Sequence, residues 1–279
     1  MKPIVSAQQV LSVKDDKNTV IVDARGGVDA FKRYSERHLE NALHVDLETE
    51  LSNKKPDAAD GGRHPLPDIH QFAITLGKLG INTKSNVFVY DDKNAAMAAA
   101  RFWWMLRAVG HKHIYVIDGG LNAAIKIGFP VTDKINYPST IIAYPVTEWK
   151  MPMIKMNALE SALKNKTSLL IDVREAYGYK GESEPIDLIA GHIPGAINIP
   201  YLENLDADGN FISDEVLKNK YAILLKDFSP ENIICQCGSG VTACHTILAL
   251  EQAGIIGVKL YVGSWSEWSR NDKRIETGL

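Results

Sequence analysis

The chain has 279 residues, of which 45% are hydrophobic and 23% are charged, and its formal net charge at pH 7 is −3. These values are typical of a folded protein with one large or two medium-sized domains. They disfavour nucleic acid as the main partner, because no basic excess is present to neutralise phosphates. No apolar run approaches the roughly 18 residues of a membrane-spanning helix, so we expect no membrane association. The first residues also lack the apolar stretch of a secretory signal.

Four motifs of the first half of the chain recur, in the same order, in the second half. The paired stretches are 20–25 with 169–174, 38–46 with 192–200, 86–92 with 232–238, and 114–120 with 258–264. Each half alternates short β-branched runs with amphipathic helical patterns, which is typical of α/β structure with a mostly parallel sheet covered by helices on both faces. We therefore predict a tandem repeat of one α/β domain.

The irregular stretch between the halves predicts the domain limits. It contains Pro138, Pro145 and Pro152 and shows no helical period. We place one domain at 1–137, a linker at 138–152 and a second domain at 153–279. A helix is expected over 95–109, ending at Gly110, and another over 158–163 with Asn157 as its N-cap.

The most informative stretch is a cysteine-containing turn between a strand at 232–235 and a helix at 241–253, which Gly254 is placed to end. Cys237 lies in this turn. Gly238 and Gly240 allow the backbone to curl, so that successive N–H groups point into the loop formed by Gly238, Ser239, Gly240, Val241 and Thr242. These donors and the following helix N-terminus favour a thiolate, and they could also hold a larger anion carried on the sulfur.

The other two cysteines fit structural roles. Cys235 and Cys244 are expected to be small buried hydrophobes, and a Cys235–Cys237 disulfide would be strained. The cysteine spacing does not make a metal site, so neither metal nor cofactor is expected. Three cysteines within ten residues suit a reducing compartment, which predicts a cytoplasmic location. Asp91 stands in the first repeat where Cys237 stands in the second, so we expect the first domain to be catalytically silent.

These motifs resemble the two-domain rhodanese superfamily of sulfurtransferases over nearly the whole chain. The resemblance rests on the Cys237 loop, on Gly191-His-Ile-Pro-Gly-Ala196, on Gly263-Ser-Trp-Ser-Glu-Trp268 and on Gly62-Arg-His-Pro-Leu-Pro67. It implies that Cys237 takes a sulfane sulfur from a donor as a persulfide and passes it to a thiophilic acceptor such as cyanide or a thiol. Two such half-reactions predict ping-pong kinetics. A thioredoxin-like reductant is a further partner to expect.

The loop residues point to the donor. Within the family, thiosulfate enzymes resemble Cys-Arg-Lys-Gly-Val-Thr and 3-mercaptopyruvate enzymes resemble Cys-Gly-Ser-Gly-Val-Thr, which is the form found here. Without a loop cation, the dianion thiosulfate lacks a charge partner. The resemblance also implies a proton relay from Ser239 to His64 and an acid of the first domain, where Glu48 stands at the position of the usual Asp.

The chain departs from the mercaptopyruvate pattern at two substrate-binding arginines. The matching positions hold Gly178 and Ile186. Arg63 and Lys180 are the candidates to replace them, although a lysine cannot form a bidentate guanidinium contact. The pattern places Trp265 near the pocket, whereas Arg174 is expected to form a structural ion pair.

Three alternatives follow from these residues. The chain could use thiosulfate through the same persulfide, or it could be a persulfide carrier or redox sensor with little turnover of small molecules. A cysteine phosphatase would need an arginine six residues after Cys237, where Ala243 stands.

Overall fold

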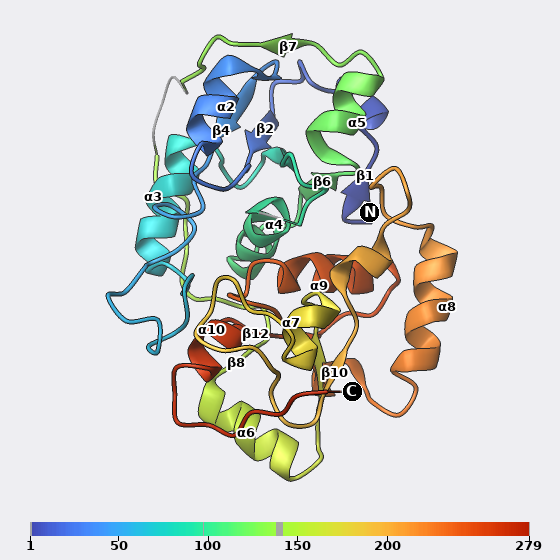
Figure 1. Cartoon of the computed structure of the whole chain (residues 1–279). Coiled ribbons are helices and arrows are strands. Elements are labelled where there is room, and N and C mark those ends of the chain that lie inside the picture. Colours follow the sequence, from blue (N-terminus) through green and yellow to red (C-terminus); the bar gives the residue numbers. More distant parts are fainter. Residues whose placement is uncertain (1, 97, 138–141, 279) are drawn as a thin grey trace. The chain divides into compact units, whose positions relative to one another are not determined.

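The computed structural model describes residues 2–96, 98–137 and 142–278 and consists of two compact units (Figure 1). The first comprises Met1–Asn53, Leu66–Met151 and Ala207–Phe211, and the second comprises Lys54–Pro65, Pro152–Asp206 and Ile212–Leu279. Residues 54–65, which precede the linker in sequence, thus pack with the second unit. The limits 1–137 and 153–279 remain a proposal. Within the described ranges, no helix is long and apolar enough to cross a membrane.

The first unit is built on a five-stranded sheet in the order β1-β6-β5-β2-β4, with every neighbouring pair parallel. Its strands are β1 (Ile4–Val5), β2 (Thr19–Asp23), β4 (Ala42–His44), β5 (Asn86–Tyr90) and β6 (Ile114–Ile117). Its helices are α1 (Ala7–Leu11), α2 (Ala30–Glu36), α3 (Ile69–Lys78), α4 (Ala98–Ala108) and α5 (Gly120–Lys126). A separate antiparallel pair joins β3 (His38–Leu39) to β7 (Val131–Thr132).

The second unit repeats this sheet in the order β10-β9-β11-β12-β8, again with all pairs parallel. Its strands are β8 (Met153–Ile154), β9 (Leu169–Asp172), β10 (Ala196–Asn198), β11 (Ile233–Gln236) and β12 (Lys259–Tyr261). Its helices are α6 (Met156–Lys164), α7 (Ala176–Lys180), α8 (Asp214–Leu224), α9 (Ala243–Gln252) and α10 (Ser264–Trp268), with 3-10 turns at Tyr201–Asn204 and Pro230–Asn232. Reversing one order matches the other strand for strand, which confirms the predicted tandem α/β repeat.

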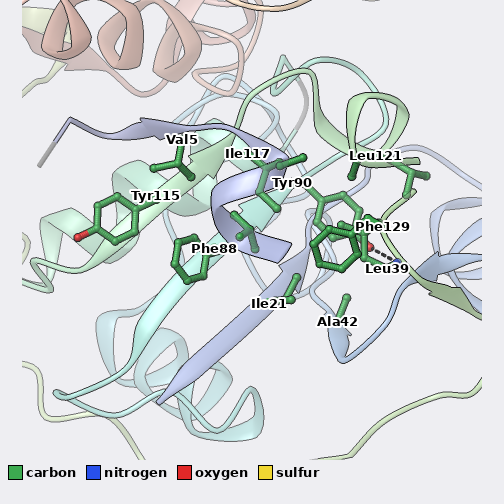
Figure 2. Close-up of a cluster of buried hydrophobic side chains, with 13 residues drawn as sticks. Val5, Ile21, Leu39, Ala42, Phe88, Tyr90, Tyr115, Ile117, Leu121 and Phe129 are labelled. Carbon is green, nitrogen blue, oxygen red and sulfur yellow. Dashed lines mark hydrogen bonds between the residues drawn. The ribbon is translucent and has the colours of Figure 1, made fainter. Parts of the chain in front are cut away.

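The alternation of side chains along the strands builds the core on both faces of each sheet. In the first unit, Phe88 and Tyr90 of β5 point to one face, where they join a buried cluster with Ile117 and Leu39 (Figure 2). The Tyr90 hydroxyl accepts a hydrogen bond from the Leu39 N–H at 3.0 Å. Val87 and Val89, which alternate with them, are also fully buried. A strand buried on both faces reads as a continuous apolar run, as the sequence of β5 does.

Three predicted helix starts need correction. The helix expected over 241–253 is α9, which begins at Ala243 after the cap residue Thr242. The helix expected from 95 begins at Ala98, because Asn94 and Ala95 have φ of 56° and 65°, in the left-handed region that a helix excludes. Asn157 is not the N-cap of α6: the cap is Lys155, whose backbone is extended and whose side chain forms no capping hydrogen bond. Gly254 does follow α9 as predicted, with φ of 88°.

Candidate active site

Cys237 follows directly after β11, the central strand of the second sheet, and only 3% of the residue is exposed. Its backbone is held from both sides. The Cys237 N–H donates to Ser264 Oγ at 3.2 Å, and its carbonyl accepts from the Trp265 N–H at 3.0 Å. The next carbonyl, of Gly238, accepts from the Ser266 N–H at 2.8 Å. The start of α10 therefore fixes where the sulfur lies.

Gly240 is required by the path of the loop. Its φ is 73°, and a Cβ on it would lie 2.3 Å from the Val262 carbonyl oxygen. A side chain here would force the loop away from β12. Gly238 has a different neighbour, because a Cβ on it would lie 3.0 Å from Arg63 Nη2. The absence of a side chain at Gly238 thus leaves room for a guanidinium that comes from outside the loop.

The loop offers backbone donors without protein acceptors. Within the described part of the chain, the N–H groups of Ser239 and Val241 make no hydrogen bond to protein. The corresponding loop of the first unit shows what such donors bind. There the Asp91 carboxylate occupies the turn: Oδ1 accepts from the N–H groups of Lys93 and Ala95 at 2.9 Å, and Oδ2 accepts from Ala99 at 3.2 Å.

By the repeat alignment, Lys93 and Ala95 correspond to Ser239 and Val241. The first unit therefore supplies its own anion, whereas the second leaves the equivalent donors available for an anion on Cys237.

The buried Asp91 carboxyl should make the first unit sensitive to pH. Burial raises its pKa from 3.8 to about 6, and the three backbone donors oppose this shift only in part. A folded-state pKa above the unfolded value means that its stabilising contribution is present below about pH 4 and is lost as the pH rises through about 6. We expect the change to be about 3 kcal/mol in the free energy of unfolding.

Asp91→Asn should remove this contribution to the pH dependence. The measurement is urea unfolding of both proteins between pH 4 and 7.5, followed by circular dichroism. Since all other groups are shared, the difference between the two curves isolates Asp91. Parallel curves would contradict the expectation.

His64 and Ser239 lie in hydrogen-bond contact, with 2.7 Å between His64 Nδ1 and Ser239 Oγ. Both residues are buried. The segment that carries His64 is tied to the region around α10, because the Gly61 N–H donates to the Glu267 carboxylate at 3.2 Å and the Arg63 N–H donates to Ser266 Oγ at 3.0 Å. The predicted pair is thus brought together within the second unit.

A cavity of about 210 Å³ opens beside Cys237. Two guanidinium groups, those of Arg63 and Arg174, lie in its wall, as do the two positions that lack the family arginines, Gly178 and Ile186. The other lining residues are Val173, Glu175, Tyr177, Glu184, Pro185, Asp187, Tyr201, Gly238, Ser239 and Thr242. The volume suits a donor of a few heavy atoms, and the two arginines suit an anionic one.

Arg174 has the structural ion pair expected of it and a place in the cavity as well. Its guanidinium binds both oxygens of Asp172, with the shortest contact at 2.6 Å, and it lies 4.6 Å from the centre of the Trp265 ring. Buried carboxylates nearby raise the pKa of Arg174, although burial opposes them. The Trp265 indole N–H donates to the Ile189 carbonyl at 2.9 Å. Trp265 therefore supports an arginine of the wall.

Two predicted site residues, Lys180 and Glu48, are not among the described residues that line the cavity. Lys180 ends α7, and its carbonyl accepts from the Gly278 N–H at 2.9 Å. Glu48 belongs to the first unit, where its N–H donates to the Asp46 carboxylate. The roles suggested for Lys180 and Glu48 stay predictions.

Sequence reasoning did not identify Asp187, Arg270, Tyr177 or Tyr201 as site residues. Asp187 belongs to an irregular stretch without periodicity, and Arg270 gave no signal because it follows α10, far from the loop in sequence.

Cys235, Cys237 and Cys244 are free thiols. Cys235 is fully buried on β11, and burial raises its pKa far above the ordinary thiol value. Burial thus disfavours the thiolate form of Cys235. Cys244 lies in the first turn of α9 and its thiol contacts the Gly240 carbonyl at 3.4 Å. This arrangement leaves Cys237 as the thiol beside the cavity.

Comparison with known proteins identifies the family. The family model for the rhodanese-like domain matches twice, at residues 6–126 and 155–271. The chain belongs to the rhodanese-like sulfurtransferases. A probable 3-mercaptopyruvate sulfurtransferase of Pseudomonas aeruginosa is 35% identical over 99% of this chain and 98% of its own length. Thiosulfate sulfurtransferase of Rattus norvegicus is 33% identical over 95% of this chain and 89% of its own length. The structure of 3-mercaptopyruvate sulfurtransferase from Leishmania major superposes with a TM-score of 0.80 at 29% identity, covering 96% of this chain and 74% of that one.

Proposed function

We propose that this rhodanese-like sulfurtransferase takes its sulfur from 3-mercaptopyruvate, carries it as a Cys237 persulfide and delivers it to cyanide or a thiol. The observation that carries the proposal is the combination at one cavity of a buried cysteine, open backbone donors and the His64–Ser239 hydrogen bond at 2.7 Å. The similarity to the Pseudomonas aeruginosa protein supports the choice of donor.

The proposed first half-reaction transfers one sulfur atom and one proton. The Cys237 thiolate attacks the thiol sulfur of the donor, and a new S–S bond forms as the donor's C–S bond breaks. The bonding electrons leave with the methylene carbon as an enolate, which takes up the proton lost from the donor thiol and becomes pyruvate. Ser239 and His64 can pass this proton because their hydrogen bond joins a hydroxyl to an imidazole. The product on the enzyme is the persulfide anion.

The persulfide anion is then held by the loop. The N–H groups of Ser239 and Val241 have no protein acceptor within the described part of the chain, so they can donate to the terminal sulfur without breaking other bonds. The Thr242 side chain lines the same cavity. An acceptor such as cyanide attacks the terminal sulfur, takes it as thiocyanate and returns the Cys237 thiolate. Donor and acceptor use the enzyme in turn, which is the basis of ping-pong kinetics.

Arg63 and Arg174 are the cations proposed to bind the donor carboxylate. Both guanidinium groups lie in the cavity wall, whereas Gly178 and Ile186 of the same wall carry no charge. The position of Arg63 in the wall supports the suggestion from the sequence that it replaces one of the missing family arginines. Arg174 adds a second guanidinium, which the sequence had suggested only as a structural group.

Thiosulfate is the rival donor. The same two guanidinium groups could bind its sulfonate, and the similarity to the rat thiosulfate sulfurtransferase favours this candidate. With thiosulfate, sulfur transfer releases sulfite and moves no proton. A persulfide carrier with little turnover of small molecules is a third possibility, which rapid turnover with either donor would exclude.

The deciding experiment is steady-state sulfur transfer to cyanide with each donor in turn. We expect kcat/KM for 3-mercaptopyruvate to exceed that for thiosulfate at least tenfold, which corresponds to about 1.4 kcal/mol of transition-state preference. A preference for thiosulfate would overturn the choice of donor. Absence of turnover with both would favour the carrier.

The proposal also covers the cellular location of the protein, its acceptor and the role of the first unit. Three free cysteines suit the cytoplasm, where a thioredoxin-like reductant would be available as acceptor. The self-supplied Asp91 anion supports a catalytically silent first unit. Glu48 remains the suggested acid of the relay.

A further inference from the structure

Asp187, a residue of the cavity wall, joins two arginines, Arg63 of the same wall and Arg270. The Asp187 side chain is 1% exposed. Its Oδ1 accepts from Arg63 Nε at 2.9 Å and from Arg270 Nη1 at 2.8 Å, and its Oδ2 accepts from Arg63 Nη2 at 3.3 Å. Arg270 also donates to the Ser266 carbonyl at 3.0 Å. We call Arg63, Asp187 and Arg270 the charge cluster.

The charge cluster carries one net positive charge, because two guanidinium groups face one carboxylate. Without Arg270, the Asp187 carboxylate would cancel the charge of Arg63. The other guanidinium of the wall, Arg174, faces two carboxylates, Asp172 at 2.6 Å and Glu184 at 3.4 Å. Arg174 with these two carboxylates carries one net negative charge, and Glu175 of the same wall adds another. Among these groups, the charge cluster is therefore the one that presents a net positive charge to an anion.

We propose that Arg270 is a positioning residue that sets the affinity of the site for anionic donors, by neutralising Asp187 so that the charge of Arg63 acts on the donor. Arg270 is not among the described residues of the cavity wall, so it acts through Arg63 and not by contact. Arg63 Nη2 would lie 3.0 Å from a Cβ at Gly238, which places this guanidinium directly against the loop. The charge cluster thus supplies from outside the loop the cation that the loop sequence lacks.

The inference rests on the proposed function only in taking Cys237 as the reacting thiol. It can be tested without a sulfur donor, by the rate at which Cys237 is alkylated by iodoacetate, an anion, relative to iodoacetamide, which is neutral. The ratio of these rates reports the electrostatic potential at the sulfur, because thiol reactivity affects both reagents alike. Cys235 and Cys244 are fully buried. All three cysteines lie on one tryptic peptide, 227–259, so fragmentation of this peptide in the mass spectrometer assigns the alkylated residue.

Arg270→Gln should lower the iodoacetate/iodoacetamide ratio about fivefold at low ionic strength, and the effect should shrink as salt is added. Arg270→Lys should keep most of the wild-type ratio. The double variant Arg270→Gln with Asp187→Asn should also restore it, because Arg63 then carries an unopposed charge. A role of Arg270 in packing alone would not predict this restoration.

Lys273→Gln is the matched control. It removes one positive charge from a side chain that is 21% exposed, against 22% for Arg270, but its partner is Glu160 of α6. Its ratio should equal that of the wild type. Equal losses in Arg270→Gln and Lys273→Gln, or no loss in either, would overturn the proposal. If Arg270→Gln does not fold, Asp187→Asn is compared with the double variant. The iodoacetate/iodoacetamide ratio must then be lower in the double variant than in Asp187→Asn.

Sulfur transfer gives the second readout. In Arg270→Gln the KM for 3-mercaptopyruvate should rise about fivefold while kcat stays near the wild-type value, since one charge is lost away from the reacting atoms. If wild-type enzyme turns over neither donor, the proposed function fails, and the alkylation ratio still decides the role of Arg270. If turnover is normal and neither the alkylation ratio nor the KM changes in Arg270→Gln, the sulfurtransferase activity stands and Arg270 has no positioning role.

Discussion

Cys237→Ser is expected to abolish sulfur transfer from both donors, with kcat/KM falling at least about 10⁴-fold, on the scale seen when a covalent nucleophile is removed. A serine hydroxyl is protonated near neutral pH and cannot form the S–S bond that carries the sulfur. The residue is 3% exposed and its backbone is fixed by Ser264 and Trp265, so the smaller oxygen should leave the fold intact. The measurement is thiocyanate production together with circular dichroism.

Mass spectrometry of the enzyme mixed with donor, without acceptor, gives an independent check. Wild-type protein should gain one sulfur atom on the peptide that contains Cys237, and Cys237→Ser should gain none. Cys235→Ala is the matched control, because Cys235 lies two residues away and is fully buried on β11. It should retain the adduct and most of the turnover. Turnover in Cys237→Ser, or an adduct on another cysteine, would refute the assignment.

Ser239→Ala is expected to separate the two donors. Transfer from 3-mercaptopyruvate moves a proton from sulfur to carbon, and loss of a proton-transfer group typically costs about 10²–10⁴-fold in rate. Transfer from thiosulfate moves no proton, so its rate should change much less. The 2.7 Å contact between Ser239 Oγ and His64 Nδ1 is the structural basis for this split. The measurement is kcat/KM for each donor in the variant and in the wild type.

His64→Gln tests whether the imidazole takes part. An amide can still hydrogen bond to Ser239 but cannot carry a proton at neutral pH, so this variant should show the same split between donors as Ser239→Ala. Equal losses with both donors in Ser239→Ala would mean that the hydroxyl shapes the loop and does not transfer a proton. A split in Ser239→Ala without one in His64→Gln would remove the histidine from the relay.

The local sequence was sufficient to locate the loop and the repeat. Cys237, Gly238 and Gly240 are adjacent in the chain, and the strand before them and the helix after them follow from short-range hydrophobic patterns. The same holds for Gly254, whose positive φ ends α9. The helix starts were harder to predict, because the extended Lys155 and the left-handed Asn94 and Ala95 depend on how each turn meets the sheet.

The match of Asp91 to Cys237 could also be predicted from the repeat, but the hydrogen bonds of the Asp91 carboxylate could not. Only the structure shows that the Asp91 carboxylate accepts hydrogen bonds from two N–H groups of its own turn and from the N–H of Ala99, at the start of α4. Whether a carboxylate fills such a turn or points away from it is decided by side-chain torsions and by the path of the backbone. A residue-type comparison contains neither.

The sequence alone therefore determined the α/β class, the tandem repeat, the family and the choice of Cys237 as the proposed nucleophile, because each of these depends on residues that are neighbours in the chain. The charges around the cavity were decided by the tertiary structure. Arg63, Asp187 and Arg270 are separated by long stretches of sequence, yet they meet at distances of 2.8–2.9 Å. Ion pairs of this kind form where the chain folds back on itself, and the sequence carries no periodic signal for them. The proposed nucleophile is thus recognised from local sequence, whereas the charge cluster proposed to act on its donor is a property of the fold.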